Sequence, residues 1–165
     1  MDIPRITRHL LMTRLQVRRA FPGDALFAIE QAIAGAEATH NGELRFVVEG
    51  ALSGAPLYQN LSARERAIDL FSHLRMWDTE GRNGVLIYLL LADRAVEIVA
   101  DRGVDARAGD TAWQDICGAM QAAFRAGHYE AGALEGVRAV SAMLSAHFPG
   151  DGPRENELSN QVVLL

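Results

Sequence analysis

The feature that most constrains the fold is an eight-residue apolar run, Val85 to Ala92, in which polar and apolar residues do not alternate. A run of this kind is typical of a strand that is covered on both faces. Asp93-Arg94 follows as a turn, and Ala95 to Ala100 returns as a second β-rich segment. The two segments therefore predict a β-hairpin.

A further strand is expected from Glu43 to Glu49, where Leu44, Phe46 and Val48 share one face. After it, Ser62 and Glu65 form a capping-box pattern that begins a helix. The apolar stripe of this helix ends at Trp77, which we expect to be mostly buried. A strand, a helix and a second strand in this order form a crossover, so the two strands are expected to be parallel.

Helical periodicity also occurs before and after these elements, within residues 24–40, 111–124 and 134–147. The predicted fold class is therefore α/β, a three-layer α/β/α sandwich with a small mixed sheet and helices on both faces.

The two ends of the chain are expected to lie outside this sandwich. Residues 3–21 predict one basic amphipathic helix, which we expect to dock on the body. The alternatives are a helix that binds a partner and a helix that lies on an anionic membrane surface. We divide the chain into an N-terminal segment (1–23), a domain (24–149) and a tail (150–165). The tail is expected either to be disordered or to dock its apolar end on a neighbour.

Composition excludes several classes of protein. A net charge of −5 argues against a general nucleic-acid binder. The single cysteine, Cys117, excludes an intrachain disulfide framework and a zinc finger. All 16 basic residues are arginine, which removes Schiff-base lysines and the P-loop lysine. No apolar run reaches the roughly 20 residues of a membrane helix and no signal peptide is visible, so we expect a cytoplasmic protein without membrane contact.

Oxygen-bearing side chains are expected to gather at one edge of the sheet. Hairpin pairing places Asn83 beside Asp101, and the parallel strand brings Glu43 to the same edge, with His40 nearby. The adjacent loops complete the predicted ligand set: Glu43, Asp78, Glu80, Asn83, Asp101 and Asp105. Calcium and magnesium prefer oxygen ligands, so a divalent cation is the expected cofactor. Alternatively, Arg82 and Arg102 neutralise these carboxylates as ion pairs.

Several short motifs resemble one known family. They are Asn83-Gly84-Val85-Leu86, Ala92-Asp93-Arg94, Val96 to Asp105, and Phe124-Arg125-x-Gly127-x-Tyr129-x-x-Gly132. Over about residues 24–148 the chain resembles the TPM domain family, which implies an α/β/α sandwich. Some family members look like acid phosphatases of the thylakoid lumen, others bind calcium, and others assist assembly of membrane complexes.

Two functions remain open at this point. The first is a binding or assembly module, with or without a bound calcium ion. The second is a metal-assisted acid phosphatase, in which Arg82 or Arg102 would stabilise phosphoryl oxygens. No nucleophile arrangement is evident, so no catalytic residue or organic cofactor is assigned. The protein partner is unknown, and a homo-oligomer is one alternative.

Overall fold

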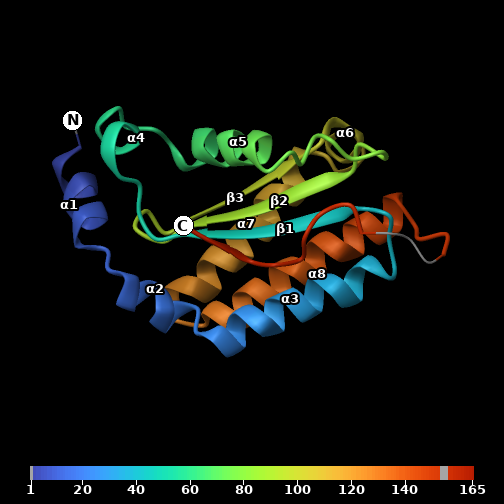
Figure 1. Cartoon of the computed structure of the whole chain (residues 1–165), viewed down its shortest axis with the longest axis horizontal. Helices are drawn as coiled ribbons and strands as arrows, with labels where there is room; N and C mark the ends of the chain where they lie inside the picture. Colours follow the sequence, from blue (N-terminus) through green and yellow to red (C-terminus); the bar gives the residue numbers. More distant parts are fainter. Residues whose placement is uncertain (1, 153–155) are drawn as a thin grey trace.

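Figure 1 shows a computed structural model of the chain, which describes residues 2–152 and 156–165. A mixed sheet with strand order β3-β2-β1-β4 lies between two layers of helices. The strands are β1 (Glu43–Glu49), β2 (Gly84–Leu90), β3 (Ala95–Ala100) and β4 (Val163–Leu164). One face is covered by α3 (Gly23–Glu37), α7 (Asp110–Arg125) and α8 (Tyr129–His147), and the other by α5 (Ala63–His73). The predicted three-layer α/β/α sandwich is confirmed.

The pairing of the central strands follows the sequence pattern. β1 runs parallel to β2, with Glu43 opposite Gly84 and Glu49 opposite Leu90. β2 and β3 form the expected antiparallel hairpin, in which Leu90 pairs with Ala95 across a four-residue connection. Every residue of β2 is buried, because helices cover both faces of this strand.

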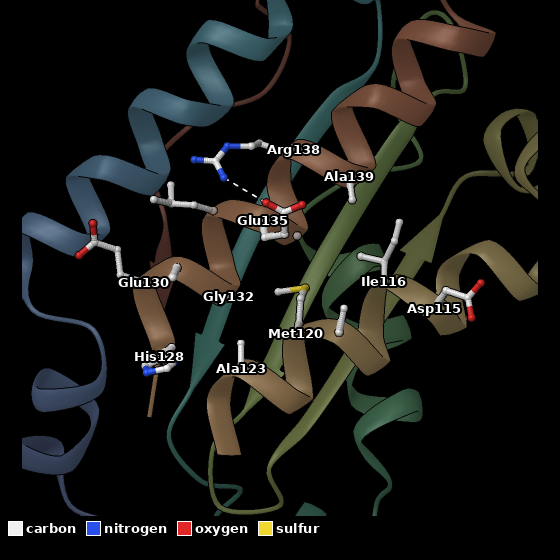
Figure 2. Close-up of a pocket in the computed structure, with 14 residues that line it drawn as sticks. Asp115, Ile116, Met120, Ala123, His128, Glu130, Gly132, Glu135, Arg138 and Ala139 are labelled. Atoms are coloured by element: carbon white, nitrogen blue, oxygen red, sulfur yellow. Dashed lines mark hydrogen bonds and ion pairs between the residues drawn. The ribbon is translucent and has the colours of Figure 1, made fainter. Parts of the chain in front are cut away.

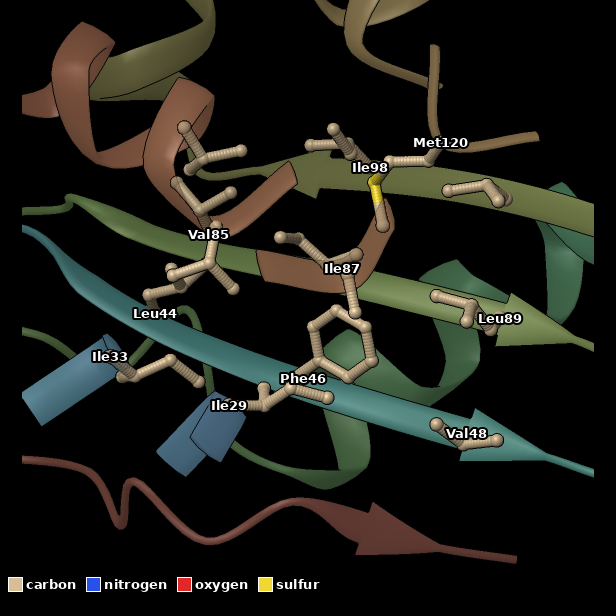
Figure 3. Close-up of a cluster of buried hydrophobic side chains, with 14 of the residues drawn as sticks. Ile29, Ile33, Leu44, Phe46, Val48, Val85, Ile87, Leu89, Ile98 and Met120 are labelled. Carbon is tan, nitrogen blue, oxygen red and sulfur yellow. The ribbon is translucent and has the colours of Figure 1, made fainter. Parts of the chain in front are cut away.

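Alternating residues divide the core into two clusters. Leu44, Phe46 and Val48 of β1 point toward α3 and α8, together with Val85, Ile87 and Leu89 of β2 (Figure 3). The intervening residues of β2, Leu86, Tyr88 and Leu90, point toward α5. A strict period of two on a doubly covered sheet produces this division.

The N-terminal segment differs from the expected single helix. It forms α1 (Ile3–Leu11) and α2 (Arg14–Ala20), because Thr13 begins a new helix with a capping box to Gln16. The expectation of one helix over 3–21 was therefore wrong. A hydroxyl side chain that bonds the backbone three residues later favours a helix start over a helix interior.

The expected burial of Trp77 was also wrong. The Ser62–Glu65 capping box is present, but α5 ends at His73. Arg75 then adopts a left-handed backbone conformation, with φ of 54°. This turn directs Met76 into the core, where it is 0% exposed, and leaves Trp77 56% exposed.

Three short elements were not expected from the sequence. They are α4 (Gly54–Tyr58), α6 (Arg102–Ala108) and the edge strand β4. β4 pairs in parallel with β1, and the Leu165 backbone N–H donates to the Val48 carbonyl at 2.9 Å. The described end of the tail therefore docks on its own sheet, whereas residues 153–155 lie outside the described residues. No helix in the described part of the chain is long and apolar enough to cross a membrane.

Candidate functional site

The start of β1, the start of β2 and the end of β3 meet at one edge of the sheet. The Glu43 backbone N–H donates to the Asn83 carbonyl at 3.2 Å, and the Asp101 N–H donates to the Gly84 carbonyl at 2.8 Å. Glu43, Asn83 and Asp101 thus lie at adjoining ends of β1, β2 and β3. Asp78 and Glu80 are exposed in the loop that precedes β2.

Several predicted ligands at this edge make other contacts. The buried Glu43 carboxylate accepts backbone N–H groups of Glu157 and Leu158 at 3.5 and 3.3 Å. The Asn83 amide, 2% exposed, donates to the Asn41 carbonyl. These bonds hold the residues before β1 and the C-terminal segment against the sheet.

Asp101 and Asp105 belong to the α6 region. Asp101 is the N-cap of α6, and its Oδ1 accepts the Arg102 N–H at 2.6 Å. Asp105, one turn later, accepts the Trp113 indole N–H at 3.2 Å and so connects α6 with α7. Both carboxylates therefore stabilise local structure in this arrangement.

The described residues do not converge on a cation. Among them, no group of three or more His, Cys, Asp or Glu side chains is arranged to hold a metal ion. Arg82 and Arg102 are exposed, and no ion pair connects either one to a carboxylate of the described residues.

A buried charged cluster that the sequence reasoning missed lies at the opposite end of the strands, beside the β2–β3 connection. In the β2–β3 connection, Asp93 accepts hydrogen bonds from the Arg5 guanidinium at 2.7 to 3.1 Å and contacts His9 Nε2 at 3.0 Å. His9 Nδ1 accepts the Leu52 N–H at 2.9 Å, which makes Nε2 the protonated nitrogen of a neutral ring. This cluster attaches α1 to the hairpin. Asp93 lay within a recognised motif, but its partners are 84 and 88 positions away.

Electrostatics at this cluster favour the ionised carboxylate. Burial alone would raise the pKa of Asp93, but hydrogen bonds from Arg5 and His9 outweigh it and hold this pKa below its ordinary value. The same contact raises the pKa of Arg5. Each charge is thus compensated by its partner.

A second buried network lies between the sheet and α5. The Glu49 carboxylate accepts two hydrogen bonds from Arg66 at 2.9 and 3.0 Å and one from the Tyr88 hydroxyl at 2.7 Å. Burial, followed by the charge of Glu49, raises the pKa of Tyr88, so the phenol stays neutral. All three groups satisfy one another, which is typical of a structural network.

A groove of about 820 Å³ lies on the outer surface between α7 and α8. Figure 2 shows Ile116, Met120 and Ala123 of α7 facing Gly132 and Ala139 of α8 across it. Glycine at positions 132 and 136 lets the two helices approach closely. A Cβ atom at Gly136 would collide with Met120, and one at Gly132 would lie 2.7 Å from the Ala123 Cβ. Small side chains on both helices leave the surface above this contact hollow.

Charged residues surround the apolar floor of this groove. Asp115, Glu130 and Glu135 contribute three carboxylates, and Arg138 forms an ion pair with Glu135 at 3.1 Å. The rim is therefore acidic on balance. The sequence signal was the recurrence of Ala and Gly along α7 and α8, which predicts close helix packing but does not predict a hollow outer surface.

The fold and the groove define a small α/β/α domain with an apolar surface groove between two of its helices. The TPM domain family model matches residues 20–143, and the chain belongs to this family. No curated protein matches the sequence.

Two solved structures are similar to the chain. The BA42 protein of the psychrophilic bacterium Bizionia argentinensis shares 29% identity with a TM-score of 0.75, covering 88% of this chain and 95% of that one. The N-terminal domain of a protein from P. gingivalis shares 21% identity with a TM-score of 0.61, covering 76% and 77%. The second similarity concerns the fold alone.

Proposed function

We propose that this TPM domain is a protein-binding module that receives an amphipathic helix in the α7–α8 groove. The observation that carries the proposal is an apolar groove of about 820 Å³ between α7 and α8, open to solvent. Recognition of a helix in such a groove relies on apolar anchors at i, i+3, i+4 and i+7. The floor residues Ile116, Met120 and Ala123 supply the complementary apolar surface.

The rim selects the charge of the ligand. Asp115, Glu130 and Glu135 surround the floor, and only Arg138 offsets them. Complementary charge steers association and suppresses partners of the wrong sign. The expected ligand is therefore a helix with arginine or lysine residues beside its apolar stripe.

Fluorescence anisotropy with a labelled model helix tests this function. The helix carries leucines at i, i+3, i+4 and i+7 and arginines beside them, and an otherwise identical helix carries glutamates. Ala119→Glu places a longer, polar side chain on the wall of the groove, where it takes the space of the leucine anchors. Ala122→Glu makes the same change at an exposed position of α7 that does not line the groove. We expect Ala119→Glu to weaken binding of the basic helix at least about 10-fold and Ala122→Glu to change it less than about 2-fold. Equal affinity of both variants for the basic helix would show that the helix does not bind in the groove.

Calcium binding remains a second proposal for the acidic edge. Asp78 and Glu80 are exposed there, and Asp101 lies at the same edge. A cation that binds only the native state raises the melting temperature. We expect millimolar calcium to raise it, and the double change Asp78→Ala with Asp101→Ala to abolish the rise. Identical melting curves with calcium and with a chelator would refute this proposal.

Phosphatase activity is the remaining alternative and requires the same cation. Release of phosphate from an aryl phosphate, measured with and without calcium or magnesium, tests it. Activity that depends on the cation and is lost in Arg82→Ala or Arg102→Ala would support this alternative, whereas no release in either condition would refute it.

A further inference from the structure

Helix α1 faces the body of the protein with its polar side. Arg5 and His9 point inward and are 8% and 3% exposed, whereas Ile3, Leu10 and Leu11 point outward and are 67–68% exposed. The three apolar residues share one helix face, because positions i, i+7 and i+8 lie close together around a helix. Leu15 of α2, 57% exposed, follows them. We call Ile3, Leu10, Leu11 and Leu15 the N-terminal apolar face.

The Asp93 cluster keeps this face exposed. Rotating α1 to bury its leucines would withdraw Arg5 and His9 from Asp93 and leave a buried carboxylate without its partners. Breaking a buried ion pair in this way is strongly unfavourable. The apolar face is therefore presented to the outside by the structure that anchors the helix.

The charge around the N-terminal apolar face is basic on balance, with Asp2, the N-cap of α1, as the one exposed carboxylate beside it among the described residues 2–23. All 21 acidic residues of the chain lie outside residues 3–23, which contain five of its 16 arginines. Four of these five, Arg8, Arg14, Arg18 and Arg19, are exposed. This surface therefore requires an apolar partner surface that is acidic at its edges.

The α7–α8 groove has the two properties expected of this partner surface. Its floor is apolar, and Asp115, Glu130 and Glu135 make its rim acidic. Its size also fits, because the groove-lining stretch of α8, residues 130–139, spans about 15 Å and the nine residues of α1 span about 13 Å at roughly 1.5 Å per residue.

We propose that the N-terminal apolar face of one copy of this chain docks in the α7–α8 groove of a second copy. The inference rests on the proposed function of the groove and names its occupant. The two contacting surfaces are different, so the contact is head-to-tail and adds further copies until a ring closes or a filament grows. The helix stays attached to its own Asp93 throughout, so no segment is exchanged between copies.

Sedimentation velocity of the full chain over a wide concentration range tests the inference. We expect the mean mass of the wild-type protein to rise above the 18.0 kDa of one chain as concentration increases. The double change Leu10→Glu with Leu11→Glu and the groove change Ala119→Glu should each keep the protein monomeric. Two control variants, Ile68→Glu at an exposed apolar residue of α5 and Ala122→Glu on α7, should associate as the wild type does.

Mixing the two monomeric variants gives the decisive measurement. Each retains the surface that the other has lost, so an equimolar mixture of Leu10→Glu/Leu11→Glu and Ala119→Glu should form a species of about twice the monomer mass and nothing larger. A contact between two identical faces would give no such rescue. Raising the salt from about 0.1 to about 1 M shortens the Debye length from about 10 to about 3 Å and should weaken association severalfold.

Three results would overturn the inference. The first is a wild-type protein that stays monomeric at every concentration. The second is association that survives Ala119→Glu, which shows that the N-terminal apolar face binds elsewhere. The third is binding of the wild type, but not of Leu10→Glu/Leu11→Glu, to phosphatidylserine vesicles without self-association, which makes a lipid surface the occupant. The anisotropy measurement with the model helix judges the groove independently in each case.

Discussion

Removing the Asp93 carboxylate should cost more stability than any other change of a single charge at the hairpin turn. In Asp93→Ala, the Arg5 guanidinium, whose side chain is 10% exposed, loses its counter-ion. His9 Nε2, whose side chain is fully buried, loses its hydrogen-bond acceptor at 3.0 Å. Arg5 keeps its hydrogen bonds to Asn60 Oδ1 and the Leu61 carbonyl, at 2.9 and 2.7 Å, but its buried charge has no counter-ion.

The expected loss follows from this geometry. Breaking a buried ion pair by removing one partner costs about 3–5 kcal/mol. Domains of this kind have a total stability of roughly 5–15 kcal/mol, so this one change removes a large fraction of it. Replacing both partners by apolar residues, as in Arg5→Met with Asp93→Leu, should cost less than Asp93→Ala alone, because no unpaired charge is left.

Urea denaturation of the full chain, followed by far-UV circular dichroism, measures these differences. Asp69→Asn, at an exposed position of α5, is the matched control and should change stability by no more than about 0.5 kcal/mol. A loss below about 1 kcal/mol for Asp93→Ala would show that other contacts hold α1. The Asp93 cluster would then not be what keeps the N-terminal apolar face exposed.

The same residue determines a pH dependence. The pKa of Asp93 is lower in the folded protein than its ordinary value of 3.8. Its ionised form therefore stabilises the fold above that ordinary value, and this contribution is lost as pH falls through the lowered folded pKa. The stability difference between wild type and Asp93→Asn should be constant near neutral pH and should shrink below about pH 4. A difference that does not change in acid would contradict the ion-pair reasoning.

Further predictions concern four other positions. Trp77→Ala should cost less than about 1 kcal/mol in urea denaturation, whereas Met76→Ala should cost about 2–5 kcal/mol, because only Met76 is buried; the reverse order would refute the described end of α5. Tyr88→Phe should cost about 1.5–3 kcal/mol, because it removes a hydrogen bond to the buried Glu49 carboxylate, and an unchanged midpoint would count against that network. Burial, with a smaller effect of Glu97, raises the pKa of the Cys117 thiol to about 11, so its alkylation by iodoacetamide at pH 8 should be on the order of 100-fold slower in the folded than in the unfolded chain; equal rates would contradict this.

Local sequence patterns were sufficient for the central layer of the fold. The alternation in β1, the unbroken apolar run of β2 and the capping box of α5 each depend on residues a few positions apart. A crossover connection makes its two strands parallel, so these local signals also predicted that Glu43, Asn83 and Asp101 meet at one end of the paired strands. They did not predict that the Glu43 carboxylate and the Asp101 side chain would bond to backbone N–H groups.

The ends of helices depended on turns that the periodicity does not reveal. Trp77 continued the apolar spacing of α5, but the left-handed turn at Arg75 reversed which neighbour enters the core. In the N-terminal segment, Thr13 divided one periodic pattern into two helices. Periodicity predicts which residues share a helix face only as long as the helix continues.

The sequence by itself determined the layered α/β/α fold, because alternation, helical spacing and caps act over short distances along the chain. Only the tertiary structure decided that α1 turns Arg5 and His9 inward and its leucines outward. A charged side chain is rarely buried without a partner of opposite charge or a hydrogen bond. The partner of Arg5 and His9 is Asp93, which lies in a turn more than 80 positions later in the sequence. Likewise, the α7–α8 groove exists because two helices approach closely at Gly132 and Gly136, a distance between helices that no local pattern encodes.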